Sequence, residues 1–245
     1  MNIAGIEKCS FVDYPGRLAA VLFTPGCNWD CYYCHNRAVL GGPVPAMTPW
    51  LDTEVTLAWL EDRRGFLDGV VISGGEPTLQ SGLADFIRRI RLKGYLIKLD
   101  TNGSRPTVLR DLLDQRLVDY VAMDVKAPLE KYEAVCGAPV DHGAVHESID
   151  LLLEGRVDYE FRTTVAPQLT EADIVAIARR IRGARRYVLQ QYRRPASNDS
   201  DPRLATPPHP ARWPSRVLEE IETLIECCET RGFDRTSQRA ASSAA

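Results

Sequence analysis

Residues 24–36 read TPGCNWDCYYCHN and place Cys27, Cys31 and Cys34 within eight positions, in the spacing C-x3-C-x2-C. His35 follows directly. Three thiols in one short loop indicate a metal site. A structural zinc ion needs four ligands, and His35 could complete a Cys3His set. The alternative is an iron–sulfur cluster with one open iron, because a cluster that only transfers electrons takes four cysteines.

The composition is that of an ordinary globular protein. The chain has 245 residues, of which 44% are hydrophobic and 26% charged, and its net charge is −3. Because the basic residues are not concentrated, we expect no nucleic-acid partner. The apolar runs are too short to span a membrane. Residues 1–17 carry charges and no apolar segment, so we expect no signal peptide and a cytoplasmic location.

Four further cysteines occur singly or as an adjacent pair, a distribution unlike a disulfide framework. Residues 35–69 contain no cysteine, so we expect no second cluster. The remaining cysteines are expected to be small buried side chains and not metal ligands; they are Cys9, Cys136, Cys227 and Cys228.

The apolar run 18–24, just before the cysteine loop, predicts a buried strand, and five similar runs follow. They lie at 69–73, 95–100, 118–125, 158–165 and 186–192. Helical patterns alternate with them at 49–64, 79–93, 106–115, 143–154, 170–181 and 216–230. This alternation predicts an α/β fold with a parallel sheet, either doubly wound or an incomplete barrel.

Local signals refine these boundaries. Thr48 and Pro49 are expected to start the first helix as N-cap and first helical residue, and Thr170 with Asp173 predicts a capping box. Residues 1–232 are expected to form a single domain with its core strands at about 18–192. An irregular loop with five prolines follows at 193–212, then the helix at about 216–230, and residues 233–245 are expected to be a disordered tail.

The unusual residues follow the ends of the predicted strands. Ligands bind at this edge of parallel α/β sheets. Each feature also has an ordinary explanation: Gly-Gly and Asn-Gly are common in turns, and Asp124 with Lys126 could form a surface ion pair. Their shared edge, beside three thiols, favours a ligand site. The features are SGGEP at 73–77, DTNG at 100–103, DVK at 124–126, Arg162 to Thr164, and Gln190 with Gln191.

With SGGEP one strand later, the motif C-x3-C-x-aromatic-C resembles the signature of radical SAM enzymes. The resemblance runs from about Gly5 to Tyr192. The segments FVDYPG (11–16), CYYCHN, DTNG and DVK resemble the glycyl-radical-enzyme activases. The closest likeness is to the anaerobic ribonucleoside-triphosphate reductase activating proteins in their longer form, and the next is to pyruvate formate-lyase activating enzyme.

This resemblance implies an incomplete (β/α)6 barrel with one [4Fe-4S] cluster on Cys27, Cys31 and Cys34. The open iron would bind S-adenosylmethionine (SAM), and reductive cleavage of SAM would give a 5′-deoxyadenosyl radical. The expected function is to generate a glycyl radical on a partner enzyme, anaerobic ribonucleotide reductase, with a flavodoxin or ferredoxin as electron donor. Two alternatives are a radical SAM enzyme acting on a small molecule and a zinc-stabilised binding module.

The resemblance also implies the residues that contact SAM. The glycine pair would allow close approach of the backbone, and a side chain at Gly75 is expected to block SAM while sparing the cluster. Tyr33 would pack on the adenine or shield the cluster, or else belong to the core. The expected SAM contacts are Tyr33, Gly74, Gly75, Glu76, Thr101, Asn102, Asp124 and Lys126.

Two further expectations are more specific. By resemblance to pyruvate formate-lyase activating enzyme, Asp100, Thr101 and Asp124 would hold a monovalent cation beside the SAM carboxylate. That enzyme has a histidine where this chain has Gln190 and Gln191, which leaves the role of Gln191 open. The 193–212 loop is expected to border the mouth of the barrel and to seat the partner's loop, or else to be a passive connection.

Overall fold

The computed structural model describes residues 1–40, 50–195, 201–207, 209 and 215–233. Its strands form one sheet in the order β1 to β8, and β2 to β8 run parallel. The six predicted strands are confirmed as β2 (Ala19–Thr24), β3 (Gly69–Gly74), β4 (Leu96–Thr101), β5 (Tyr120–Asp124), β6 (Asp158–Val165) and β7 (Tyr187–Gln191). Two edge strands were not predicted, the antiparallel β1 (Gly5–Ser10) and β8 (Cys228–Arg231).

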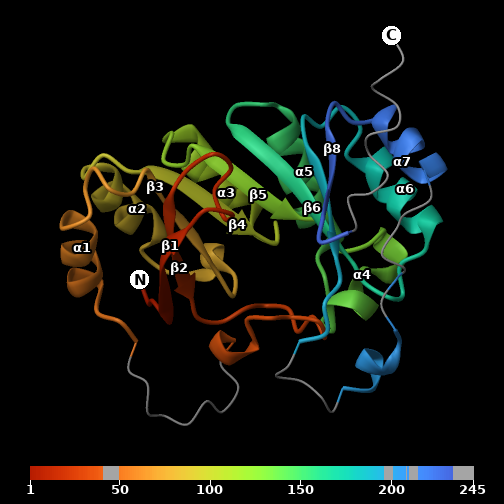
Figure 1. Cartoon of the computed structure of the whole chain (residues 1–245), viewed down its shortest axis with the longest axis horizontal. Coiled ribbons are helices and arrows are strands. Elements are labelled where there is room, and N and C mark those ends of the chain that lie inside the picture. Colours follow the sequence, from red (N-terminus) through yellow and green to blue (C-terminus); the bar gives the residue numbers. More distant parts are fainter. Residues whose placement is uncertain (41–49, 196–200, 208, 210–214, 234–245) are drawn as a thin grey trace.

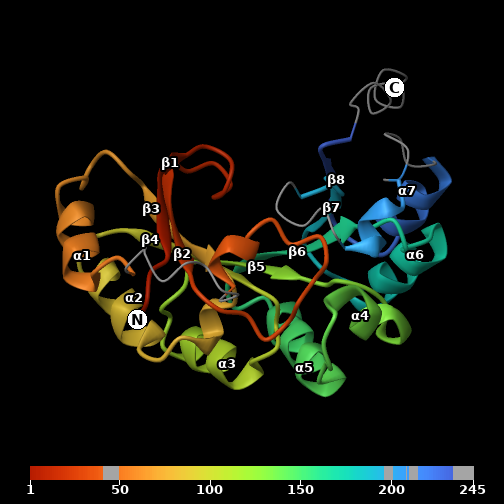
Figure 2. The same ribbon diagram turned by 90° about the horizontal axis from the view of Figure 1, so that it is seen from below.

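The sheet is strongly curved but open. In the described residues β1 and β8 are its two edges and do not pair with each other. Figures 1 and 2 show the α-helices arranged around the convex side of the sheet, whereas the segment that contains η1 (Arg37–Val39) passes over the concave side. The prediction of an incomplete barrel is therefore confirmed.

The two faces of the strands have different surroundings. On the convex side, residues such as Leu22, Val70 and Ile72 are fully buried against the helices, and each such side chain contributes roughly 1.5–3 kcal/mol to folding. On the concave side, a second apolar cluster joins Val21, Val71 and Tyr120. These residues lie in the first halves of their strands, so apolar packing closes that end of the half-barrel.

Tyr14 also belongs to this second apolar cluster. It comes from the loop between β1 and β2, is 5% exposed, and places its ring 5.9 Å from the ring of Tyr120. A Cβ on Gly69 would lie 3.0 Å from the Tyr14 ring, so a glycine is required for this packing. The concave side is consequently accessible from the carboxyl ends of the strands.

Most predicted helices are confirmed with shifted ends. They are α1 (Thr53–Glu61), α2 (Leu83–Arg91), α3 (Pro106–Asp114), α5 (His142–Leu153) and α6 (Glu171–Arg180). Asp52, and not Thr48, is the N-cap of α1, because its carboxylate accepts hydrogen bonds from the backbone of Glu54 and Val55. Thr48 and Pro49 lie outside the described residues. The capping box of Thr170 and Asp173 is confirmed.

Short elements were missed or misplaced. The structure has an additional helix, α4 (Leu129–Cys136), and 3-10 turns at η1 (Arg37–Val39), η2 (Pro77–Leu79) and η3 (Pro202–Ala205). The helix predicted at 79–93 begins only at Leu83, because η2 and a left-handed Gly82 precede it. The segment expected to be irregular, 193–212, contains η3, whose Leu204 is buried in the core.

The prediction of one helix at 216–230 was wrong. α7 (Ser215–Glu222) is followed by β8, which pairs with β7 from Tyr187 to Gln190. Ile221 and Ile225 are both buried, so the apolar spacing continues beyond the end of the helix while the backbone turns toward the free edge of β7. Phe233 is also buried, so the expected tail cannot begin there. Residues 234–245 lie outside the described residues.

Along the part of the chain that the structure describes, we find no helix with the length and apolarity that a membrane span requires.

Candidate active site

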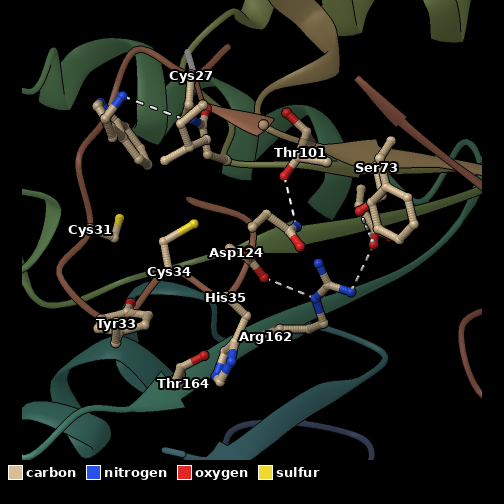
Figure 3. Close-up of a pocket in the computed structure, with 18 of the residues that line it drawn as sticks. Cys27, Cys31, Tyr33, Cys34, His35, Ser73, Thr101, Asp124, Arg162 and Thr164 are labelled. Carbon is tan, nitrogen blue, oxygen red and sulfur yellow. Dashed lines mark hydrogen bonds and ion pairs between the residues drawn. The ribbon is translucent and has the colours of Figure 1, made fainter. Parts of the chain in front are cut away.

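A cavity of about 460 Å³ opens at the carboxyl ends of the strands. In Figure 3 the three cysteines lie toward one side of it, and Ser73 and Arg162 lie opposite. The predicted residues that line the cavity are Cys27, Tyr33, Cys31, Cys34, Gly74, Gly75, Asp100, Thr101, Asn102, Asp124 and Lys126. The edge of the sheet that the sequence indicated is thus the edge at which this cavity lies.

The cysteine loop is held in place by its own backbone and by α4. The Cys34 N–H donates to the carbonyl of Cys31 at 3.0 Å, and the Asp30 N–H donates to the carbonyl of Cys136 at 2.8 Å. Trp29 is buried with its ring edge-on to Tyr132, 5.6 Å between centroids. The helix that sequence analysis missed therefore anchors the segment that carries the motif.

The thiols of this loop have different environments. Burial raises the pKa of Cys27 to about 11 and also raises that of Cys34. The neighbouring Cys136 thiol lowers the pKa of Cys31 to about 7. Cys136 is fully buried, as expected, and is not among the residues that line the cavity. Cys9 and Cys227 are exposed and Cys228 is half-buried, so the expectation that these three are buried was wrong.

The glycine pair is packed against the cysteine loop. A Cβ on Gly75 would lie 1.9 Å from the carbonyl oxygen of Gly26, and one on Gly74 would lie 2.4 Å from the Thr24 nitrogen. The Asn36 amide also donates to the Gly74 carbonyl at 2.9 Å. The expectation that a side chain at Gly75 spares the cluster is therefore corrected, because such a side chain would displace the loop itself.

Glu76 has a supporting position. It is fully buried, and it accepts hydrogen bonds from the Thr78 backbone at 3.1 Å, the Thr101 hydroxyl at 2.7 Å and the Asn102 backbone at 2.7 Å. Burial raises its pKa despite these bonds. It is not among the residues that line the cavity, so it ties the end of β3 to the end of β4 and does not face a ligand there.

Asn102 contacts the cysteine loop. Its side-chain amide donates to Asn28 Oδ1 at 3.0 Å and lies 3.8 Å from Cys27 Sγ. The Trp29 N–H is 3.4 Å from the same sulfur. Donors around a cysteine sulfur are typical of thiolates that ligate a metal.

Tyr33 forms part of the cavity wall. Its ring packs edge-on against Tyr32 and Tyr192, and Lys126 Nζ lies 6.0 Å from the ring centroid. The buried hydroxyl of Tyr33 has no hydrogen-bond partner among the described residues. Unpartnered buried polar atoms are rare, so this hydroxyl is suited to a ligand in the adjacent cavity.

A layer of charged side chains faces the cysteines. Asp124 is bonded to Lys126 Nζ at 2.8 Å and to Arg162 Nε at 2.9 Å. Asp100 is paired with Lys98 and with Arg162 Nη1, the latter at 3.3 Å. Although burial raises the pKa of both carboxyls, these cations hold both pKa values below the usual range.

Arg162 lies at the same strand end as the predicted SAM contacts and lines the cavity with them. Arg162 in β6 is paired with Asp124 in β5. Because side chains alternate between the two faces of a strand and paired residues share a face, both side chains lie on the concave side. The same alternation resolves the glutamine pair: Gln190 lines the cavity, whereas Gln191 contacts Gly232 beyond β8. Asp13, Ser73 and Thr164 also line the cavity and were not selected.

The donor set fits a cluster in the cavity. Three thiols line it, and Figure 3 shows the ring of His35 beside Thr164 and away from the cysteines. Among the described residues, no three His, Cys, Asp or Glu side chains converge closely enough for a single metal ion. The unpartnered Tyr33 hydroxyl and the cationic layer fit a polar ligand beside the thiols.

Comparison with known proteins agrees with this geometry. A protein of Methanocaldococcus jannaschii named as a candidate glycyl-radical enzyme activating enzyme is 36% identical over 196 residues, or 78% of this chain and 79% of that protein. Another from the same organism, named in the same way, is 29% identical and spans 62% of this chain and 58% of its own length.

The fold has a close counterpart among solved structures. SuiB from Streptococcus suis, in a crystal structure with S-adenosylmethionine, superposes with a TM-score of 0.63 at 12% identity, over 86% of this chain and 52% of that one. At this identity the likeness concerns the fold alone. Residues 21–181, well over half of the chain, match the model of the Radical SAM superfamily, and the chain is therefore an enzyme that belongs to this superfamily.

Proposed function

We propose that this protein is an activase that generates a glycyl radical on a partner enzyme, with anaerobic ribonucleoside-triphosphate reductase as the partner. The observation that carries the proposal is the cavity that faces both the three-cysteine loop and the cationic layer. The activase class is supported by the relative at 36% identity, which aligns over most of both chains. We propose a flavodoxin or ferredoxin as the electron donor.

Members of the superfamily use a [4Fe-4S] cluster and SAM. When bound, this pair supplies a 5′-deoxyadenosyl radical by reductive cleavage of SAM. In this chain Cys27, Cys31 and Cys34 would hold the cluster, and no fourth cysteine lines the cavity among the described residues. One iron would thus keep a position for SAM.

Several side chains would orient SAM and exclude water. Lys126 and Arg162 would bind its carboxylate, since both line the cavity and carry positive charge. Asp124 would accept from a ribose hydroxyl or from the amine. Tyr33 would supply a flat apolar wall and a free hydroxyl. The backbone of Gly74 and Gly75, both of which line the cavity, would approach the amino end of SAM.

The proposal predicts a radical on the partner. The reconstituted protein, mixed anaerobically with dithionite, SAM and anaerobic ribonucleotide reductase, should give an electron paramagnetic resonance doublet from the reductase. With Cys31→Ala the doublet should be absent. SAM cleavage that yields no radical on this reductase, while another glycyl-radical enzyme is activated, would contradict the proposed partner. Cleavage with no activation of either would favour a small-molecule substrate.

The η3 segment lies beside the cysteine loop. Arg203 lies 4.9 Å from the ring centroid of Tyr32 in the cysteine loop, and Leu204 anchors the turn in the core. Ala205, Thr206 and Pro207 next to them are exposed. We therefore propose that residues 205–207 border the entrance and contact the partner. The positions 196–200, 208 and 210–214 of the predicted docking loop lie outside the described residues.

A bulky residue at this surface tests the docking role. Ala205→Tyr should lower glycyl-radical formation on the partner at least tenfold, because a tyrosine would obstruct the contact, and it should leave partner-free SAM cleavage unchanged. Leu92→Tyr, at an exposed position directly after α2, is the control. Equal radical yields from the two variants would place the docking surface elsewhere.

We also propose a cytoplasmic location. All seven cysteines are free thiols in the structure, and several are exposed or half-buried, which suits a reducing compartment.

A further inference from the structure

We propose that this site takes no monovalent metal ion, and that the buried Lys98 and Arg162 supply the positive charge that such an ion would bring. The inference rests on the proposed use of SAM, and it concerns the three residues expected to bind the ion, Asp100, Thr101 and Asp124. It makes Lys98 a positioning residue for the SAM site.

The oxygen atoms of the expected ion site already have partners. Asp100 is paired with Lys98 and Arg162, and it also accepts from Ser73 Oγ at 3.1 Å. Asp124 is held by Lys126 at 2.8 Å and by Arg162 at 2.9 Å. An ion bound between these carboxylates would have to displace at least one of these cations.

Thr101 is engaged as well. Its hydroxyl donates to Glu76 at 2.7 Å and accepts from the Gly103 N–H at 3.1 Å. The side chain is buried and therefore turned toward the support under the strand ends. Of the three expected ligands, none presents a side-chain oxygen without a partner.

The charge of the layer is also unfavourable to a cation. Three cations, Lys98, Lys126 and Arg162, surround two carboxylates, which leaves one positive charge. Of two further carboxylates nearby, Glu160 is paired with Arg231 at 2.9 Å, and Asp13 lines the cavity and accepts a hydrogen bond from Ser10. The group of five side chains around Asp100 and Asp124 thus repels an added cation, and it would attract the SAM carboxylate, the anionic group that the proposed function brings into the cavity.

Lys98 cannot withdraw from this arrangement. Its side chain is only 1% exposed on the concave face, and Asp100 is its ion-pair partner. If Asp100 turned to a metal ion, the ammonium would remain buried without a counter-charge, which is strongly unfavourable. Lys98 is not among the residues that line the cavity, so it acts on the ligand through Asp100 and Arg162.

The first test uses the unmodified protein. Two quantities are compared in sodium, potassium and choline chloride at equal ionic strength. The melting temperature of the cluster-free protein should not change. The SAM affinity of the cluster-loaded protein should agree within about twofold among the three salts. A rise of tenfold or more in SAM affinity, or a clear rise in melting temperature, with sodium or potassium relative to choline would overturn the proposal.

The second test removes the lysine charge. Lys98→Met should weaken SAM binding at least tenfold in choline chloride, and sodium or potassium should restore part of it, because a small cation can then compensate Asp100. Lys98→Arg and the surface variant Lys93→Met should stay insensitive to the cation. Cation-insensitive SAM binding in a folded Lys98→Met protein would also overturn the proposal.

The two tests separate this inference from the proposed function. If SAM does not bind the cluster-loaded protein in any salt, the proposed function fails. In that case, the melting temperatures of the unmodified, cluster-free protein still show whether a monovalent ion binds. The same measurement decides the question if the Lys98→Met protein does not fold.

Discussion

Replacing Cys31 by alanine is expected to abolish cluster binding, whereas Cys136→Ala is expected to retain it. Cys31 lines the cavity on the motif loop, and Cys136 lies behind it on α4. Because a three-cysteine site has no spare ligand, the loss of one thiol should reduce iron from about four per chain to well below one. Iron analysis and visible absorbance after anaerobic reconstitution measure the result.

The comparison of the two variants has a second readout. Cys136 lies beside Cys31 and lowers the pKa of its thiol, and a thiol that donates to a cluster sulfur raises the reduction potential. Cys136→Ala should therefore lower the potential of the cluster while keeping its iron, and Cys136→Ser should recover part of the loss. Loss of iron in Cys136→Ala would instead show that Cys136 is a ligand.

Gly75→Ala is expected to disrupt both the fold and cluster loading. The added Cβ would lie 1.9 Å from the Gly26 carbonyl, which belongs to rigid backbone next to Cys27. Overpacking of this kind costs about 1–3 kcal/mol of folding free energy, and displacing the loop should also lower the iron content. Urea unfolding of the cluster-free protein and iron analysis measure the two effects.

Gly5→Ala is the matched control for this substitution. Gly5 lies in β1, and its added Cβ would make only an ordinary contact, 3.9 Å from the Phe23 ring. Its stability should change by less than about 1 kcal/mol. A stable Gly75→Ala protein with full iron and weak SAM binding would restore the original interpretation, in which the glycine serves only the ligand.

The parallel core of the fold was predictable because its signals are local. Each of β2 to β7 is a short apolar run followed by a turn and a helical pattern, which predicts the order and direction of the strands. β8 was not predictable in this way. The sequence CETR in β8 has no strand pattern of its own, and it becomes a strand because the free edge of β7 offers it hydrogen-bond partners.

The candidate site was predictable in its location and less so in its contacts. The cysteine motif and the residues at the strand ends indicated one edge of the sheet, where the cavity lies. The role of Glu76 depends on Asn102, which is 26 residues away and follows the neighbouring strand. The role of Lys98 depends on its burial beside Asp100, which the packing of the half-barrel determines. A linear sequence shows such residues only as ordinary polar positions.

The anchoring of the cysteine loop by α4 has a consequence for assembly of the metal centre. Trp29 packs on Tyr132, and the backbone of Asp30 is bonded to the end of α4, and neither contact uses a thiol of the motif. Because these contacts do not depend on a bound cluster, we expect the conformational entropy of this part of the loop to be lost when the polypeptide folds. Iron and sulfide would then meet a preorganised acceptor, which favours fast cluster assembly.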